Sequence, residues 1–353
     1  MRLKTPLNRI IALGKGDGLR AQLLRGGIGV GALKILSVPL SLLATVLLAR
    51  GLGPEGFGQY SFVIALVTIL SIPLGPALKE LTTRETARIH QAGDHTKIRA
   101  LLQWANQHVL LGSTIVIIVV GGASLWMADW QVDDRWTLLL VGLIAIPLLG
   151  VSAVRAGVLA GLRRMVQGQL PDLLIRPLVL LLVVSAMMFS GFLSPLTAVV
   201  AFLVGTVLAL ATGVILLQRM LPNSAGGTTP PTDTSQNRQW RRSWMPFTLL
   251  IAASTMNAQI GILLLGVLST EAQVAAMRVA ERGAMLTTLA LTVVNLVISP
   301  YITRVHNAGD RGKLQTLSRH SARIALLLAL PIAVPLIFFG GPILTLIFGA
   351  KYA

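Results

Sequence analysis

Seven ionisable side chains fall inside otherwise apolar stretches of this 353-residue chain. They are Lys34, Arg155, Asp172, Arg176, Arg278, Glu281 and Arg282. Burying a charge in an apolar span is costly, so such residues usually face a polar cavity. Five of the seven are cations, and a guanidinium stays charged while offering paired donors that match phosphate oxygens. The pattern therefore predicts a cavity whose lysine and arginines bind an anionic substrate.

Two other arrangements of these charges remain open. Arg155 and Arg176 could snorkel, with their heads at the lipid headgroups and their aliphatic stems in the apolar region. Arg278, Glu281 and Arg282 are spaced three and four residues apart on one stretch, the spacing of a local ion pair on a helix face. In either arrangement these side chains would not contact substrate.

Uncharged polar residues interrupt two further apolar stretches. They are Gln103, Asn106, Gln107 and His108 on one face of the third stretch, and Asn257 and Gln259 in the seventh. We predict that Asn106 and His108 join the cavity, while hydrogen bonding between neighbouring helices is the alternative. His108 and Glu281 are also candidates for a coupling proton, because histidine titrates near neutral pH and a carboxylate away from water takes up a proton more readily.

The same inventory argues against an enzyme. The chain has no cysteine, which removes thiolate metal sites and cysteine nucleophiles together. Residues 14–18, Gly-Lys-Gly-Asp-Gly, lack the preceding strand and the spacing of a phosphate-binding loop. A membrane-embedded glycosyltransferase or polymerase would need an acidic metal-binding or general-base motif, or a large extramembrane loop. We predict no catalytic residue, no metal and no cofactor.

The composition requires a membrane. Hydrophobic residues make up 54% of the chain and charged residues 12%, whereas soluble domains carry about a quarter charged residues. Apolar stretches long enough to cross about 30 Å of hydrocarbon recur along the chain. Nine spanning helices are predicted at 27–49, 58–78, 101–125, 137–160, 172–190, 196–217, 245–268, 274–299 and 322–339. The predicted fold class is an all-α polytopic membrane protein.

Charge asymmetry predicts the orientation of these spans. Twenty-two of the thirty Lys and Arg residues fall on one side of the nine-span topology, which the positive-inside rule assigns to the cytoplasm together with the amino terminus. Trp126, Trp130 and Trp136 flank the acidic loop on the other side as an interfacial aromatic belt would. The net charge of +17 therefore reflects topology, and no nucleic-acid partner is expected. The predicted location is the bacterial cytoplasmic (inner) membrane.

The chain also repeats itself at an offset of 216 residues. Residues 88–97 and 304–313 are identical at six of ten positions, where average composition gives about one by chance. Both loops follow the second helix of a lobe on the same side, so the copies run parallel, as in two-lobed transporters with a substrate site between the lobes and alternating access.

The repeat predicts four segments. These are a basic amino-terminal segment at 1–26, a first six-helix transmembrane lobe at 27–219, a flexible cytoplasmic linker at 220–244, and an incomplete second lobe of three helices at 245–353. Residue 353 corresponds to residue 137, where the fourth helix of the first lobe begins. A complete relative is therefore expected to run about a hundred residues longer.

Residues 48–60, Leu-Ala-Arg-Gly-Leu-Gly-Pro-Glu-Gly-Phe-Gly-Gln-Tyr, join the first two predicted helices. This stretch resembles the signature of the Wzx-like oligosaccharide flippases, the polysaccharide-exporting branch of the multidrug/oligosaccharidyl-lipid/polysaccharide (MOP) exporter superfamily. Residues 272–300 and 341–352 resemble the family more weakly. The signature residues Gly53, Pro54, Glu55, Gly56, Gly58 and Tyr60 are expected to form a tight structural connector rather than a site.

The resemblance implies two six-helix lobes around a central cavity. It also implies transfer of an undecaprenyl-diphosphate-linked oligosaccharide across the cytoplasmic membrane for O-antigen (lipopolysaccharide), capsule or exopolysaccharide synthesis, beside a polysaccharide polymerase or ligase. One alternative is a cation-coupled multidrug exporter of the same superfamily, which would need acidic residues in its cavity. Another is a non-transporting remnant that assembles with envelope-glycan proteins.

Overall fold

The computed structural model describes residues 19–127, 134–221, 234–307 and 310–349. Every regular element within these residues is a helix, which confirms the predicted class. The elements are α2 (Leu19–Leu70), α3 (Pro76–Gln91), α4 (His95–Met127), α5 (Asp134–Leu143), α6 (Ala145–Gly161), α7 (Met165–Leu170), the π-helical turn η1 (Pro171–Ile175), α8 (Arg176–Phe189), α9 (Pro195–Met220), α10 (Thr234–Leu268), α11 (Glu271–Asn307) and α12 (Arg311–Phe348). Residues 1–18 of the predicted amino-terminal segment, residues 128–133 of the acidic loop with Trp130, and residues 222–233 of the predicted linker lie outside the described residues.

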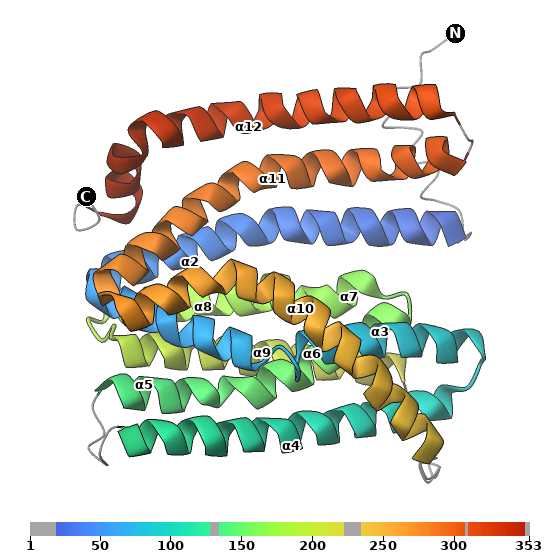
Figure 1. The fold of residues 1–353 in the computed structure, drawn as a ribbon, viewed down its shortest axis with the longest axis horizontal. Coiled ribbons are helices and arrows are strands. Elements are labelled where there is room, and N and C mark those ends of the chain that lie inside the picture. Colours follow the sequence, from blue (N-terminus) through green and yellow to red (C-terminus); the bar gives the residue numbers. More distant parts are fainter. Residues whose placement is uncertain (1–18, 128–133, 222–233, 308–309, 350–353) are drawn as a thin grey trace.

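The junctions between helices gather at two ends of the bundle (Figure 1). One end has the α3–α4, α6–α7, α9–α10 and α11–α12 junctions, and we call it the linker end. The other end has the bend in α2 and the α4–α5, α8–α9 and α10–α11 junctions, and we call it the elbow end. Seven helices in the described residues are long and apolar enough to span a membrane. The first of them, Gly29–Leu70, contains the bend and crosses twice, and α11, with 37 residues, also runs between the ends. This alternation gives the nine predicted crossings.

A glycine produces the bend in α2. Gly53 has φ 71° and ψ 177°, a positive-φ conformation that favours glycine because it lacks a Cβ atom. Pro54 follows, and proline suits the first turn of a helix, where its missing N–H costs nothing. The span predicted at 27–49 and most of the span predicted at 58–78 are therefore the two arms of α2, which meet at an elbow, and the second span continues into the start of α3.

The helix bounds follow the 216-residue repeat. With that shift, 19–52 in α2 corresponds to 235–268, and α10 covers Thr234–Leu268. The segment 54–91, which ends with α3, corresponds to 270–307, and α11 covers Glu271–Asn307. The start of α4 at His95 corresponds to Arg311, the first residue of α12. The two copies thus share secondary structure as well as sequence.

The two repeated loops also cap the next helix in the same way. The carboxylates of Asp94 and Asp310 accept hydrogen bonds from the backbone N–H groups of Lys97 at 3.4 Å and Lys313 at 3.0 Å. Each lysine ammonium lies 2.8 Å from the same carboxylate. Hydrogen bonds from Lys97 and then Thr96 lower the pKa of Asp94 to about 2, and Lys313 lowers the pKa of Asp310. Both aspartates therefore cap their helices in the ionised form.

Small residues set the spacing of α3 and α6. A Cβ atom at Gly157 would collide with Thr82 and lie 2.5 Å from the main-chain oxygen of Lys79, and one at Gly161 would lie 2.6 Å from Cβ of Thr86. In lipid, helix association depends on close van der Waals packing, and small residues four apart allow the backbones to approach. This pair stiffens the first lobe.

The predicted flexible linker at 220–244 is helical from Thr234 onward, because α10 already begins there. Trp240 is 1% exposed and its ring centroid lies 5.4 Å from that of Trp104 in α4. The indole N–H of Trp244 donates to the main-chain oxygen of Pro73 at 2.7 Å. Burial of these aromatic rings holds the start of α10 against the first lobe, an effect that the polar and basic composition of the segment does not reveal.

Gly157→Val should destabilise the protein through this α3–α6 contact. The added methyl groups meet backbone atoms that have no room to move, so we expect a loss of about 2 kcal/mol in the free energy of unfolding. Gly122→Val in α4 is the matched control, because nothing lies within 4 Å of a Cβ atom there. Thermal unfolding in detergent, followed by tryptophan fluorescence, measures the difference. Equal midpoints for the two variants would contradict the packing argument.

Candidate functional site

A cavity of about 210 Å³ lies between the first lobe and the helices that follow the linker. Its walls come from both halves of α2, from α8 and α9, and from α10 and α11. The lining residues are Ser41, Ala44, Thr45, Leu48, Phe57, Tyr60, Ser61, Ile64, Thr68, Pro177, Leu180, Phe202, Gln259, Arg278 and Arg282. We call it the central cavity.

The central cavity lies deep in the bundle. Arg278 and Arg282 follow Glu271, the first residue of α11, by seven and eleven residues. At 1.5 Å per residue they lie about 10 and 16 Å along the helix from the elbow end. Since a hydrocarbon core is about 30 Å thick, both residues are expected to lie within it.

Arg278 connects three helices at the cavity wall. It is 9% exposed, and its Nη1 lies 3.2 Å from the carboxylate of Glu281 on the same helix. Its Nη2 donates to the main-chain oxygen of Ser61 in α2 and to the side-chain oxygen of Gln259 in α10, both at 3.4 Å. The local ion pair left open by the sequence is therefore present, and it coexists with a position in the cavity wall.

Arg282 is less fully bonded than Arg278. Its Nη1 lies 3.7 Å from the sulfur of Met285, a weak acceptor, and its Nε is buried without a hydrogen-bond partner among the described residues. The hydroxyl oxygen of Ser61, a residue that is 1% exposed, is likewise buried without a partner there. Buried polar atoms are nearly always hydrogen-bonded, so two donors at this cavity are available to a ligand or to water.

Several polar residues of the cavity escaped the sequence analysis. Tyr60 was expected only in a structural connector, and Ser61 was not singled out. Ser41 and Thr45 lie in an ordinary apolar span, yet both line the cavity. The available signal was helical spacing: Ser41 and Thr45 are four residues apart on one face, and Gln259 interrupts the seventh span. Only the fold shows that these faces meet.

The residues Arg155, Asn106 and His108 lie elsewhere, inside the first lobe. Arg155 of α6 donates to the side-chain oxygen of Asn106 in α4 at 3.4 Å and to the main-chain oxygen of Val151 at 2.9 Å. The ring of His108 lies 4.1 Å from that of Trp104, centroid to centroid, and its Nδ1 lies 2.9 Å from the Trp104 main-chain oxygen. None of the three lines the central cavity. The bond from Arg155 to Asn106 matches the alternative of bonding between helices, whereas the hydrogen bond of His108 lies within its own helix.

The remaining two predicted cations are also outside the lining of the central cavity. Arg176 forms an ion pair with Asp172 inside the fifth span, across the π-helical turn η1. Lys34 is exposed on α2. Pro177, the residue after Arg176, lines the central cavity. The irregular turn that carries the Asp172–Arg176 pair is therefore directly connected to the wall of that cavity.

The signature residues shape the elbow and the contact between lobes. Gly56 packs against Pro195: a Cβ atom added at Gly56 would lie 3.2 Å from Cγ of Pro195. A Cβ atom added at Gly58 would collide with the main chain of Glu271. Tyr60 is 7% exposed and lines the central cavity. Glu55 is exposed. The connector thus brings α2 onto α11 and places one aromatic ring at the cavity.

Arg50 joins the first lobe to the last helix at the elbow end. Its Nε donates to the main-chain oxygen of Ile347 at 2.8 Å and its Nη2 to that of Leu346 at 2.5 Å. These carbonyls belong to the last turn of α12, where a helix lacks its own donors and its dipole favours a cation. Together with the contact at Gly58, this interaction joins the two lobes at the elbow end.

The family model of polysaccharide biosynthesis proteins matches residues 23–306. The chain belongs to this family. The match covers the first lobe, α10 and nearly all of α11, so it includes every helix that lines the central cavity. No curated protein matches the chain.

Solved structures with the same fold are MOP-superfamily transporters. An inward-facing multidrug resistance MATE family transporter is similar with a TM-score of 0.68 at 17% identity, over 96% of this chain and 74% of that chain. The outward-facing form of such a transporter gives 0.58 at 16% identity, over 97% and 76%. A MOP superfamily transporter from Pyrococcus furiosus gives 0.56 at 17% identity, over 96% and 75%. The protein therefore has a MOP-type helical fold, in which three helices follow the linker within the described residues.

Arg50→Ala should loosen the contact between the lobes at the elbow end. Since the chain has no cysteine, an Ala275→Cys reporter can be introduced in α11 at a position that is 0% exposed. Loss of two hydrogen bonds from a charged group should raise the rate of maleimide labelling by about tenfold in detergent. Arg323→Ala, on the exposed surface of α12, is the control. Labelling at the same rate in both variants would show that Arg50 does not hold the lobes together.

Proposed function

We propose that this protein moves a lipid-linked oligosaccharide, carried on undecaprenyl diphosphate, across the bacterial cytoplasmic membrane by alternating access between its two lobes. The product would serve O-antigen, capsule or exopolysaccharide synthesis. The amino terminus and the linker end would face the cytoplasm, as the charge asymmetry predicts. A polysaccharide polymerase or ligase would receive the substrate on the other side.

The charge balance of the central cavity carries this proposal. Two guanidinium groups line it, and the described lining residues include no carboxylate. Glu281 forms an ion pair with Arg278, and no ion pair among the described residues includes Arg282. A buried charge needs a partner of opposite sign, and a diphosphate supplies one together with acceptors for the free donors of Arg282 and Ser61.

The size of the cavity fits one stage of a transport cycle. A volume of about 210 Å³ is below the roughly 300–1,000 Å³ of sites for drug-sized ligands, so it suits a diphosphate better than a whole oligosaccharide. The sugars must therefore occupy space that opens when the lobes part. Because Arg50 and Gly58 join the lobes at the elbow end, entry from the linker end is the arrangement we propose.

The same charge balance disfavours a multidrug exporter that carries cations in this cavity. A lipophilic cation would be repelled by Arg282 and would find no carboxylate among the described lining residues. For the similar transporter from Pyrococcus furiosus, a reverse polarity of the binding pocket suggests a different function. We propose a comparable relation here, in which one MOP fold serves anionic or cationic cargo according to the charge in its cavity.

Neutralising Arg282 should impair both export and substrate binding. Arg282→Gln removes a charge-assisted hydrogen bond worth about 1.5–3 kcal/mol, which corresponds to at least about a tenfold loss. Arg282→Lys, which keeps the charge, should be intermediate, and the exposed Arg319→Gln in α12 should equal the parent. Surface glycan in a flippase-deficient bacterium reports export, and native mass spectrometry of the purified chain with undecaprenyl diphosphate reports binding. Membrane levels of each variant are compared by immunoblot.

Two results would reject the proposal. One is parental binding and export by Arg282→Gln. The other is efflux of ethidium by the same cells without any transfer of glycan, which would establish the multidrug alternative. Binding of undecaprenyl diphosphate without export, with partner proteins retained on purification, would instead support an assembling role.

A further inference from the structure

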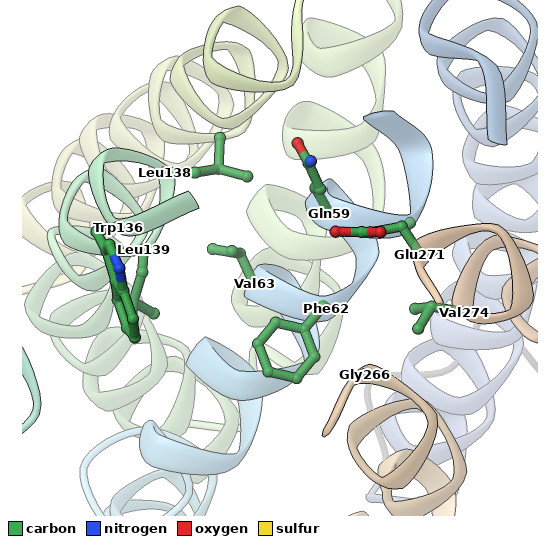
Figure 2. Close-up of a pocket in the computed structure, with 10 residues that line it drawn as sticks. Gln59, Phe62, Val63, Trp136, Leu138, Leu139, Gly266, Glu271 and Val274 are labelled. Atoms are coloured by element: carbon green, nitrogen blue, oxygen red, sulfur yellow. The ribbon is translucent and has the colours of Figure 1, made fainter. Parts of the chain in front are cut away.

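A second cavity of about 210 Å³ opens at the elbow end (Figure 2). Its lining comes from the second half of α2 and from α5 in the first lobe, and from the end of α10 and the start of α11 after the linker. Gly58 and Glu271, which bring the two lobes into contact, both belong to this lining. We call it the elbow-end cavity.

The elbow-end cavity has the opposite chemistry to the central cavity. The aromatic rings of Phe62 and Trp136 and the aliphatic side chains around them form most of its walls. Its polar side chains are Gln59 and Glu271, which lie beside each other in Figure 2. Among the described lining residues one is anionic and none is cationic.

A carboxylate in the first turn of a helix has an ordinary role, because it offsets the partial positive charge of the helix amino terminus. That role does not require a cavity in front of the carboxylate or aromatic walls opposite it. Aromatic faces attract cations through their quadrupole, most strongly away from water, and a carboxylate adds a direct attraction. The combination of Glu271, Phe62 and Trp136 is therefore complementary to a cation with an apolar body.

We propose that the elbow-end cavity binds a small hydrophobic cation of the quaternary ammonium or amphiphilic amine class. Trp136 begins the fourth span at the expected membrane interface, where such amphiphiles concentrate. The occupant would contact both lobes at once, since Phe62 belongs to α2 and Glu271 to α11. It would therefore stabilise the form that is closed at this end and slow any transport that requires the elbow end to open.

This inference is independent of the substrate of the central cavity. The probe is tritiated phenyltrimethylammonium, bound to the purified chain in nanodiscs and measured by scintillation proximity. tert-Butylbenzene, which has the same shape without the charge, is the competitor that isolates the electrostatic contribution. We expect saturable binding that unlabelled phenyltrimethylammonium displaces at a concentration at least about tenfold lower than tert-butylbenzene does.

The repeat supplies a matched control for the carboxylate. Glu55 corresponds to Glu271 at the 216-residue offset, yet it is exposed and does not line the cavity. Glu271→Gln should weaken binding by about tenfold, whereas Glu55→Gln should leave it within about twofold of the parent. Arg282→Gln, in the central cavity, should also leave it unchanged.

Four results would overturn the proposal. They are the absence of saturable binding, equal displacement by the neutral competitor, parental affinity in Glu271→Gln, and a loss of affinity in Glu55→Gln equal to that in Glu271→Gln. If Glu271→Gln does not elute as a folded species, Leu139→Phe provides the test, because Leu139 lines the cavity and the larger ring reduces its volume. Full binding by a folded Leu139→Phe variant would place the cation elsewhere.

Discussion

A charge in the apolar interior of a membrane must find a partner of opposite sign, a set of hydrogen bonds or a polar cavity. Much of this helical bundle follows from that constraint. Asp172 and Arg176 neutralise each other across an irregular turn, Arg155 donates to an amide and a main-chain oxygen, and Arg278 has a carboxylate and two oxygen acceptors. Arg176 and Arg282 each have a buried Nε without a partner among the described residues. Arg176 is paired with Asp172, whereas Arg282 has only a sulfur contact among the described residues and faces the central cavity. The unbalanced charge and the cavity between the lobes coincide.

The spans, their number and the repeat could be predicted from the sequence, because each depends on short-range properties of the chain. Hydrophobic length determines where a helix can cross, and the duplicated loop gives the register that the bounds of α11 and α12 follow. The start of α10 could not be predicted, since Trp240 and Trp244 hold a polar segment in place through contacts with the first lobe. The elbow at Gly53 appeared in the sequence only as a connector between two helices.

The candidate site was only partly predictable, for a related reason. Arg278 and Arg282 lie on the helix that meets the first lobe, so their charge reaches the central cavity, whereas Arg155 is just as unusual in its span but faces α4. Sequence identifies which residues are costly in lipid and does not say which neighbour relieves the cost. Tyr60 and Ser61 show the converse, since Tyr60 was expected only in a structural connector, Ser61 was not singled out, and the folding of α2 back on itself brings both to the cavity.

The central claim is that the cavity between the lobes recognises a diphosphate on a lipid carrier. Equilibrium binding of undecaprenyl diphosphate and of undecaprenol, the same carrier without phosphate, to the purified chain tests it most directly. The account predicts that the diphosphate binds at least about tenfold more tightly at low salt, because Arg282 and Ser61 donate to its oxygens in a poorly hydrated site. Equal affinity for the two lipids would mean that only the apolar chain is bound, and would contradict the account.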